Sequence, residues 1–167
     1  MRIILPAALA GLIASPALAA DLAVKIEVPK LDVAEYHKPY VAVWIEGADR
    51  SVVNLAVWYD VKAKDNKGNE WLKDLRQWWR KAGRELDMPA DGLSSATRAP
   101  GEHTLDFSGS DAPLKNLEPG QYTLVVEAAR EVGGRELLKV PFTWPGKAAG
   151  GARGTSELGA VSLAIKP

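Results

Sequence analysis

Apolar and polar residues alternate along much of this chain, which is the pattern of strands that bury one face. Every second residue is apolar over 22–28, until Pro29 ends the run. Two denser runs, 40–45 and 52–59, carry apolar residues on both of their faces. The turn-forming sequence GADR lies between them, so we predict a hairpin in the middle of a sheet.

The second half of the chain shows the same alternation. It predicts three further strands, at 103–107, 122–128 and 136–144. The pair Gly133-Gly134 predicts a hairpin turn between the last two of these. A final strand is predicted over 157–165, after a glycine-rich segment, 147–154, that we expect to be a flexible loop.

Strands that follow one another in hairpins, rather than alternating with helices, favour an antiparallel sandwich. The pattern gives about seven strands, which is the number in a simple immunoglobulin-like domain. We therefore expect a mostly β protein, an immunoglobulin-like antiparallel β-sandwich with one inserted amphipathic helix. The single domain is expected to span residues 20–167.

The inserted helix is predicted where the apolar period changes from two to between three and four. Five residues form one helical stripe: Trp71, Leu75, Trp78, Trp79 and Ala82. Charged residues fill the opposite face, Asn69 could cap the start, and Gly83 could cap the end. We expect one helix of about three turns that is held against the sheet by its indole rings.

The chain begins with the pattern of a secretory signal peptide. A short charged start precedes an apolar run that ends in ALA at 17–19, which puts small residues at the −3 and −1 positions of a cleavage site. Pro16 favours cleavage over anchoring because it breaks a helix near its end. We expect Sec-type export and cleavage of residues 1–19, which leaves a periplasmic domain that is not inserted in the membrane. A retained anchor is the alternative.

Composition excludes several classes of protein. The sequence has no cysteine, so disulfide-stapled modules, thiolate metal sites and cysteine nucleophiles are excluded. The 21 basic and 21 acidic residues balance, which gives no electrostatic reason to expect nucleic acid as a partner. No motif of a known hydrolase, metalloprotease or nucleotide-binding enzyme is present, so we expect a protein that is not an enzyme.

Three patches are candidates for binding. The first is EYHKPY at 35–40, where His37 could ligate a metal or a haem iron. The second is the predicted helix, where Trp79 and Arg80 could stack on a planar ligand. The alternatives are a loop histidine bonded to backbone and a helix whose indoles serve only as anchors.

The third patch combines the hydroxyls of a loop with fixed guanidinium groups, which together can hold a carboxylate or a phosphate. Its residues are Ser95, Thr97, Arg98, Glu127 and Arg130. The alternative is a network of Arg/Glu ion pairs, including Arg135 and Glu136, that only fastens a long loop to a hairpin.

Five segments together resemble a known family. They are YHKPYVAVWIE, WLKDLRQWWRK, SSATRAPGEHT, GQYTLVVEAAREVGGRE and ELGAVSLAI. In order and spacing they resemble the predicted periplasmic proteins grouped as domain of unknown function 2271, over about residues 22–167. The resemblance implies an immunoglobulin-like sandwich similar to the domain in flagellar hook-capping proteins. Members often carry a histidine where this chain has Val132, a departure that weakens the prediction of a metal or haem.

The family is similar in genomic setting to PepSY-type membrane proteins and flavin transferases. The resemblance therefore implies an accessory role in envelope iron handling or flavin-dependent electron transfer. We expect a non-enzymatic periplasmic binding or accessory protein whose partner is a membrane-embedded or periplasmic redox or iron-uptake protein. No cofactor is expected in this case. The alternative hypothesis is an electron-transfer accessory that carries a haem or a metal on His37.

Overall fold

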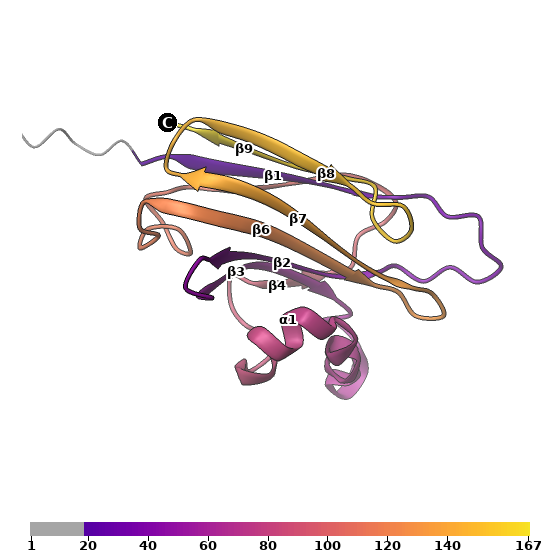
Figure 1. Ribbon diagram of the computed structural model, residues 1–167. Coiled ribbons are helices and arrows are strands. Elements are labelled where there is room, and N and C mark those ends of the chain that lie inside the picture. Colours follow the sequence, from indigo (N-terminus) through magenta and orange to yellow (C-terminus); the bar gives the residue numbers. More distant parts are fainter. Residues whose placement is uncertain (1–18) are drawn as a thin grey trace, which may run out of the picture.

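The computed structural model describes residues 19–167 and contains two β-sheets that pack face to face. Residues 1–18, which hold nearly all of the predicted signal peptide, lie outside the described residues. The four-stranded sheet has the order β5-β1-β9-β8, and the five-stranded sheet has the order β4-β3-β2-β6-β7. Figure 1 shows these two layers with a third, helical layer on the free face of the five-stranded sheet.

The strands are β1 (Asp21–Val28), β2 (Tyr40–Gly47), β3 (Val52–Tyr59), β4 (Ser94–Ala96), β5 (Gly101–Phe107), β6 (Gly120–Ala129), β7 (Arg135–Trp144), β8 (Ala148–Arg153) and β9 (Ala160–Lys166). The predicted β-sandwich is confirmed, as are the hairpins β2–β3 and β6–β7. Two details differ from the prediction. The described residues form nine strands where the pattern gave about seven, and the pair β3–β4 is parallel.

The two missed strands had weak signals in the sequence. β4 is only three residues long, and its residues from Ser94 to Ala96 are polar or small. β8 has the glycine-rich sequence AAGGAR, which was predicted to be flexible, yet it pairs along its whole length with β9. Since glycine and alanine have little intrinsic preference for strands, the pairing itself determines this conformation.

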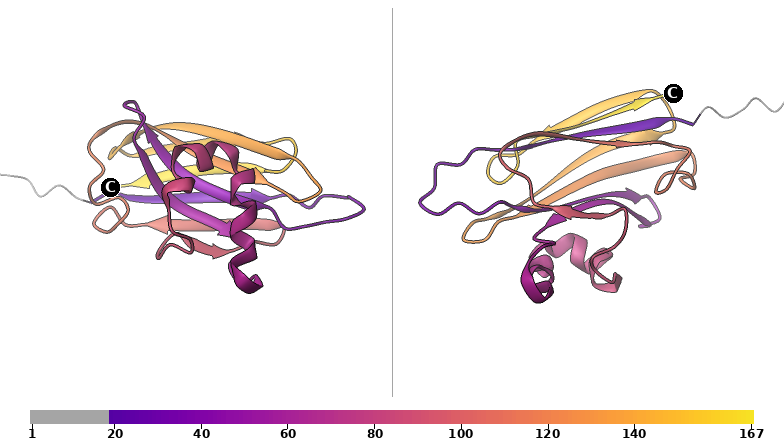
Figure 2. Two further views of the ribbon diagram at one scale, coloured as in Figure 1. Left: turned by 90° about the horizontal axis from the view of Figure 1, so that it is seen from below. Right: turned by 180° about the vertical axis from the view of Figure 1, so that it is seen from behind.

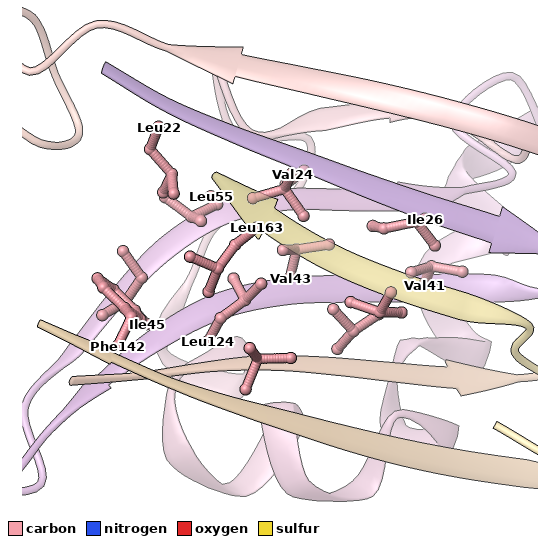
Figure 3. Close-up of a cluster of buried hydrophobic side chains, with 14 of the residues drawn as sticks. Leu22, Val24, Ile26, Val41, Val43, Ile45, Leu55, Leu124, Phe142 and Leu163 are labelled. Carbon is pink, nitrogen blue, oxygen red and sulfur yellow. The ribbon is translucent and has the colours of Figure 1, made fainter. Parts of the chain in front are cut away.

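The inner core lies between the two sheets and is built by the alternation that the sequence showed. Leu22, Val24 and Ile26 of β1 point toward Val41, Val43 and Ile45 of β2, and all six are at most 1% exposed. Figure 3 shows these side chains interleaved with Leu124, Phe142 and Leu163 from three other strands. A β-bulge where β2 pairs with β3 turns both Leu55 and Ala56 toward this core.

The outer face of the five-stranded sheet is covered by a helical layer, which Figure 2 shows lying across β2 and β3. The layer consists of η1 (Lys64–Asp74), α1 (Arg76–Lys81) and η2 (Gly83–Glu85). Its buried cluster includes Trp44, Val57 and Tyr59 from the sheet, with Leu72, Leu75 and Trp78 above them. Among the described residues, no helix is long and apolar enough to cross a membrane.

The inserted helix is confirmed, but the prediction that it runs unbroken for about three turns is wrong. The chain leaves helical geometry at Leu75 (φ −75°, ψ 71°), so a 3₁₀ segment and a short α-helix replace the predicted three turns. Trp78 is fully buried, but Trp71 is 52% exposed, so the indoles do not form one anchoring stripe. Asn69 caps nothing and donates to the Met88 carbonyl, and Gly83 begins η2.

Candidate functional site

A cleft of about 1170 Å³ opens at one end of the sandwich, and we call it the end cleft. Most of its lining comes from three segments that are distant in the sequence: the chain before β2, the helical segment η1 and the β6–β7 turn. Figures 1 and 2 show the β1–β2 connection and the β6–β7 hairpin extending from the same end of the molecule. Its size is comparable to that of small-molecule sites, which enclose about 300–1,000 Å³.

Aromatic rings form much of the wall of the end cleft. They are Tyr36, His37, Tyr40 and Trp71. Tyr40 is fixed, because its hydroxyl donates to the Gly68 carbonyl at 3.1 Å and its ring meets Tyr59 edge to face. Trp71 instead leaves half of its surface in solvent, which is uncommon for so large an apolar side chain. Such rings offer flat surfaces on which a planar group can stack.

Charged side chains of both signs also line the end cleft. The cations are Lys38, Lys67, Arg76, Arg130 and Arg135, and the anions are Asp60, Asp74 and Glu131. Arg130 and Arg135 are paired with glutamates, Glu157 and Glu127, that lie outside the cleft. The cleft is therefore polar and close to balanced in charge, with two guanidinium groups fixed in its wall.

Arg130 is the more deeply buried of these two arginines. Its side chain is 6% exposed, and Nε and Nη2 donate to the Glu157 carboxylate at 2.8 and 3.2 Å. Glu157 also accepts the Gly134 backbone N–H at 2.8 Å, so one carboxylate holds both ends of the β6–β7 turn. The guanidinium lies between this turn and the ring of Tyr36, whose centroid is 6.0 Å from Cζ.

Two donors in this wall have no protein partner. Arg130 Nη1 and Tyr36 Oη are both shielded from solvent and have no hydrogen-bond acceptor among the described residues. Burial raises the pKa of Tyr36, and Glu157 adds to this while Arg130 opposes it, so the phenol stays protonated as a donor. Buried donors of this kind normally bond to protein, water or ligand, because leaving one unsatisfied costs about 1–3 kcal/mol.

Glu127 and Arg135 form the junction between the end cleft and the helical layer. Glu127 is fully buried on β6 and accepts the backbone N–H groups of Gln77 and Trp78 at 2.9–3.1 Å. Arg135 Nη1 donates to the same carboxylate at 2.8 Å. The acid therefore satisfies donors at the start of α1 that have no partner within the helix.

A second, smaller hollow of about 400 Å³ adjoins the end cleft, and we call it the basic hollow. Its lining consists of Lys73, Arg76, Gln77, Trp79, Arg80 and Arg135. It contains no carboxylate, and it shares Arg76 and Arg135 with the end cleft.

The structure brings together only some of the residues that the sequence singled out. Thr97 and Arg130 both line the end cleft, whereas Trp79 and Arg80 line the basic hollow. Arg98 lines neither, because its guanidinium stacks on Trp58 at 5.2 Å. Ser95 lies beside it, with Oγ 3.4 Å from Arg98 Nη2, so the expected set of loop hydroxyls and arginines is divided between two places.

The predicted Arg/Glu network exists, but it holds other segments than expected. Glu127 anchors α1, and Glu136 accepts four backbone N–H groups from residues 155–158 at 2.7–3.1 Å. Neither acid contacts the 94–98 loop in any described hydrogen bond or ion pair. Burial raises the pKa of Glu136, but these backbone donors outweigh that effect, so its pKa lies below the ordinary value.

His37 lies in the wall of the end cleft with both ring nitrogens beside carboxylates. Nε2 is 2.7 Å from Glu35 Oε1, and Nδ1 is 3.5 Å from Glu131 Oε2. Within residues 19–167, no group of three or more histidine, cysteine or acidic side chains could hold a metal ion. A bound iron would have to displace Glu35 or Glu131 from the ring, and ligation by His37 stays a prediction.

Two residues that build or support the cleft were not singled out from the sequence. Trp71 of the cleft was assigned to a buried stripe, and Glu157, which holds Arg130 from outside the cleft, was taken as part of a strand. The exposure of Trp71 follows from the break at Leu75, which periodicity does not reveal. In the β6–β7 turn Val132 itself takes positive φ (+51°), which residue type does not predict because β-branched residues are rare there.

A family model described as "Predicted periplasmic protein (DUF2271)" matches residues 21–160. The chain belongs to this family. The resemblance noted in the sequence is thus confirmed, and this DUF2271 protein is periplasmic, as the family description states. No curated protein matches the chain, and no solved structure does.

Proposed function

We propose that this DUF2271 domain is a non-enzymatic binding protein of the periplasm, and that its end cleft holds a planar small molecule with an anionic group. The observation that carries the proposal is the pair of unsatisfied donors, Arg130 Nη1 and Tyr36 Oη, in the wall of an aromatic cleft. An anionic ligand that turned the Tyr36 ring toward the cleft would supply hydrogen-bond acceptors for these donors. The planar part would stack on Trp71, whose exposed ring faces solvent.

The proposal is that the domain binds its ligand without catalysing a reaction. The recorded partners of the two histidines are carboxylates for His37 and the Ala99 carbonyl for His103. Neither ring is paired with a hydroxyl that it could activate as a nucleophile. The arginines of the cleft are held in fixed ion pairs, which suits binding and orientation of an anion rather than proton transfer.

Planar molecules with phosphate or carboxylate groups include the cofactors of membrane electron transfer. The proposal therefore extends to an accessory role beside a membrane flavin or PepSY-type redox system, or beside an iron-uptake system. In such a role the domain would hold or deliver the cofactor, and the membrane protein would perform the chemistry.

Titration with flavin mononucleotide and with haemin tests the proposal. We expect saturable binding of at least one of them, followed by flavin fluorescence or by the haem absorption band. Trp71→Ala should weaken that binding at least about tenfold, since stacking on an aromatic ring is worth about 1–3 kcal/mol. The control is Trp79→Ala, which removes an indole from the basic hollow alone. No binding of either compound, or equal loss in both variants, would overturn the proposal.

The second candidate, a haem or metal carrier that uses His37, is separated by the same titration. One observation favours it, namely that the imidazole lies in the wall of the end cleft. His37→Ala would then abolish the haem absorption shift, whereas Trp71→Ala would only weaken it. Binding that persists in His37→Ala supports the leading proposal.

A further inference from the structure

The lining of the basic hollow has four cationic side chains and no carboxylate. The full chain has equal numbers of basic (Lys and Arg) and acidic residues, and six ion pairs join them within residues 19–167. Lys73, Arg76 and Arg80 take part in none of these. On the same helical layer Lys81 pairs with Glu46 at 3.1 Å. What distinguishes the hollow is that three cations without an ion pair lie together on one surface, beside Arg135 and an indole.

Two other members of the hollow are held rigidly in place. Arg135 is bonded to the buried Glu127 carboxylate, and the ring of Trp79 packs at 6.4 Å against Trp78, which is fully buried. The surface therefore combines a fixed guanidinium and a fixed indole with three exposed cations. Arginine and tryptophan are the residue types most enriched at the energetic centres of protein interfaces.

We propose that the basic hollow is a docking surface for an acidic segment of a partner protein. A row of carboxylates on such a segment complements Lys73, Arg76 and Arg80, and Trp79 offers a flat apolar contact beside them. A single small anion fits less well, because the three unpaired cations are exposed and would remain hydrated around it. The net charge of the chain does not reveal this basic surface, because acidic residues elsewhere balance its positive charge.

This proposal does not depend on a ligand in the end cleft. The test variants therefore change residues that line the basic hollow and leave the end cleft unchanged. Arg76 and Arg135 line both hollows, so they are left unchanged. Lys73 and Arg80 line the basic hollow alone, and both are exposed, so charge reversal there leaves the fold intact. The variant is Lys73→Glu with Arg80→Glu. The matched control reverses two exposed lysines outside both hollows, Lys115→Glu with Lys166→Glu.

The probe is a fluorescein-labelled oligoglutamate peptide, measured by fluorescence anisotropy at low ionic strength with oligoglutamine as the neutral comparison. We expect saturable binding of oligoglutamate to the wild-type protein and none of oligoglutamine. Affinity should fall at least about tenfold in the Lys73/Arg80 variant and by less than about twofold in the control. Added salt should weaken binding because the contacts are exposed charges.

Four results would overturn the proposal. These are the absence of saturable binding, equal weakening in the control, and complete displacement by inorganic phosphate at an ionic strength where chloride has no effect. The fourth is tighter, variant-sensitive binding to phosphatidylglycerol vesicles, which would assign the hollow to a membrane surface. The cofactor titration of the end cleft, repeated on the Lys73/Arg80 variant, should be unchanged, so failure of either proposal is visible separately.

Discussion

Two glutamates on neighbouring strands serve opposite faces of the five-stranded sheet. Glu127 points to the outer face, is fully buried, and accepts two backbone N–H groups of α1 together with Arg135. Glu136 lies on the neighbouring strand β7, where it pairs with Ala128, and its side chain is on the inner side of the sheet. It is partly exposed and accepts the backbone N–H groups of residues 155–158. Each carboxylate fastens an irregular segment to the sheet.

The difference between the two lies in what else supports the fastened segment. Residues 155–158 lie between β8 and β9, which pair with each other and pack on the inner core. The helical layer has no strand pairing and rests on its cluster around Trp78 and on Glu127. The outer layer, which carries the basic hollow and part of the end cleft, should therefore be the more sensitive to single substitutions.

The largest expected effect is that of Glu127→Ala. It leaves the buried Trp78 N–H, the partly buried Gln77 N–H and the partly exposed Arg135 guanidinium without their acceptor, so we expect a loss of about 3–5 kcal/mol in the free energy of unfolding. Urea unfolding measures the loss, and hydrogen exchange should show that Gln77 and Trp78 lose protection first. Leu124→Ala in the inner core is the comparison, and it should lower protection throughout the domain. A uniform loss in Glu127→Ala would contradict the account.

A medium effect is expected for Gly83→Ala. An added Cβ would lie 2.5 Å from the ring of the buried Trp78, so the ring or the backbone must shift. We expect a destabilisation of about 1–3 kcal/mol, as for other overpacked sites. Gly146→Ala is the matched control, since a Cβ there meets nothing within 4 Å. Thermal unfolding of the two variants should differ, and equal stability would show that the outer cluster is loosely packed.

The prediction of one continuous helix failed for the physical reason that these variants test. The spacing of Trp71, Leu75 and Trp78 is helical, but Glu127, distant in the sequence, captures the N–H groups of residues 77 and 78 and so favours a new helix start. Long-range hydrogen bonds of this kind leave no local pattern. By contrast, the period-two alternation predicted the inner-face strands well, because burial of one face is a local property of a strand.

The candidate site, like the fold, was predictable from the sequence only in part. The segments around His37, Thr97 and Arg130 were singled out by residue type, and the structure brings these three to one cleft. The pairing of Arg130 with Glu157 joins the β6–β7 turn to a residue that the sequence offered only as part of a strand. Arg98 was wrongly grouped with Arg130, because its actual partner, Trp58, belongs to a strand whose apolar sequence predicts only core packing.

The smallest expected effect is that of Glu136→Gln, and it depends on pH. Because the pKa of Glu136 is lowered in the folded state, its carboxylate stabilises the fold fully above the ordinary glutamate pKa of about 4.3. That contribution is lost as the pH falls through the lower, folded-state pKa. We expect Glu136→Gln to be about 1 kcal/mol less stable than wild type at neutral pH.

Chemical denaturation across the acid range provides the check, with the exposed Glu70→Gln as the control. The gap between Glu136→Gln and the wild-type protein should close as the medium is acidified, whereas Glu70→Gln should follow the wild type at every pH. A gap of constant size would mean that Glu136 acts through its shape rather than its charge.

Native mass spectrometry of the protein recovered from its own periplasm tests the central claim most directly. The account predicts that the wild-type domain carries a bound small molecule and that Trp71→Ala, with an intact fold, has lost it. The Lys115→Glu/Lys166→Glu control should retain the same added mass. A wild-type domain without added mass, or a Trp71→Ala variant that keeps it, would contradict the assignment of the end cleft as a binding site.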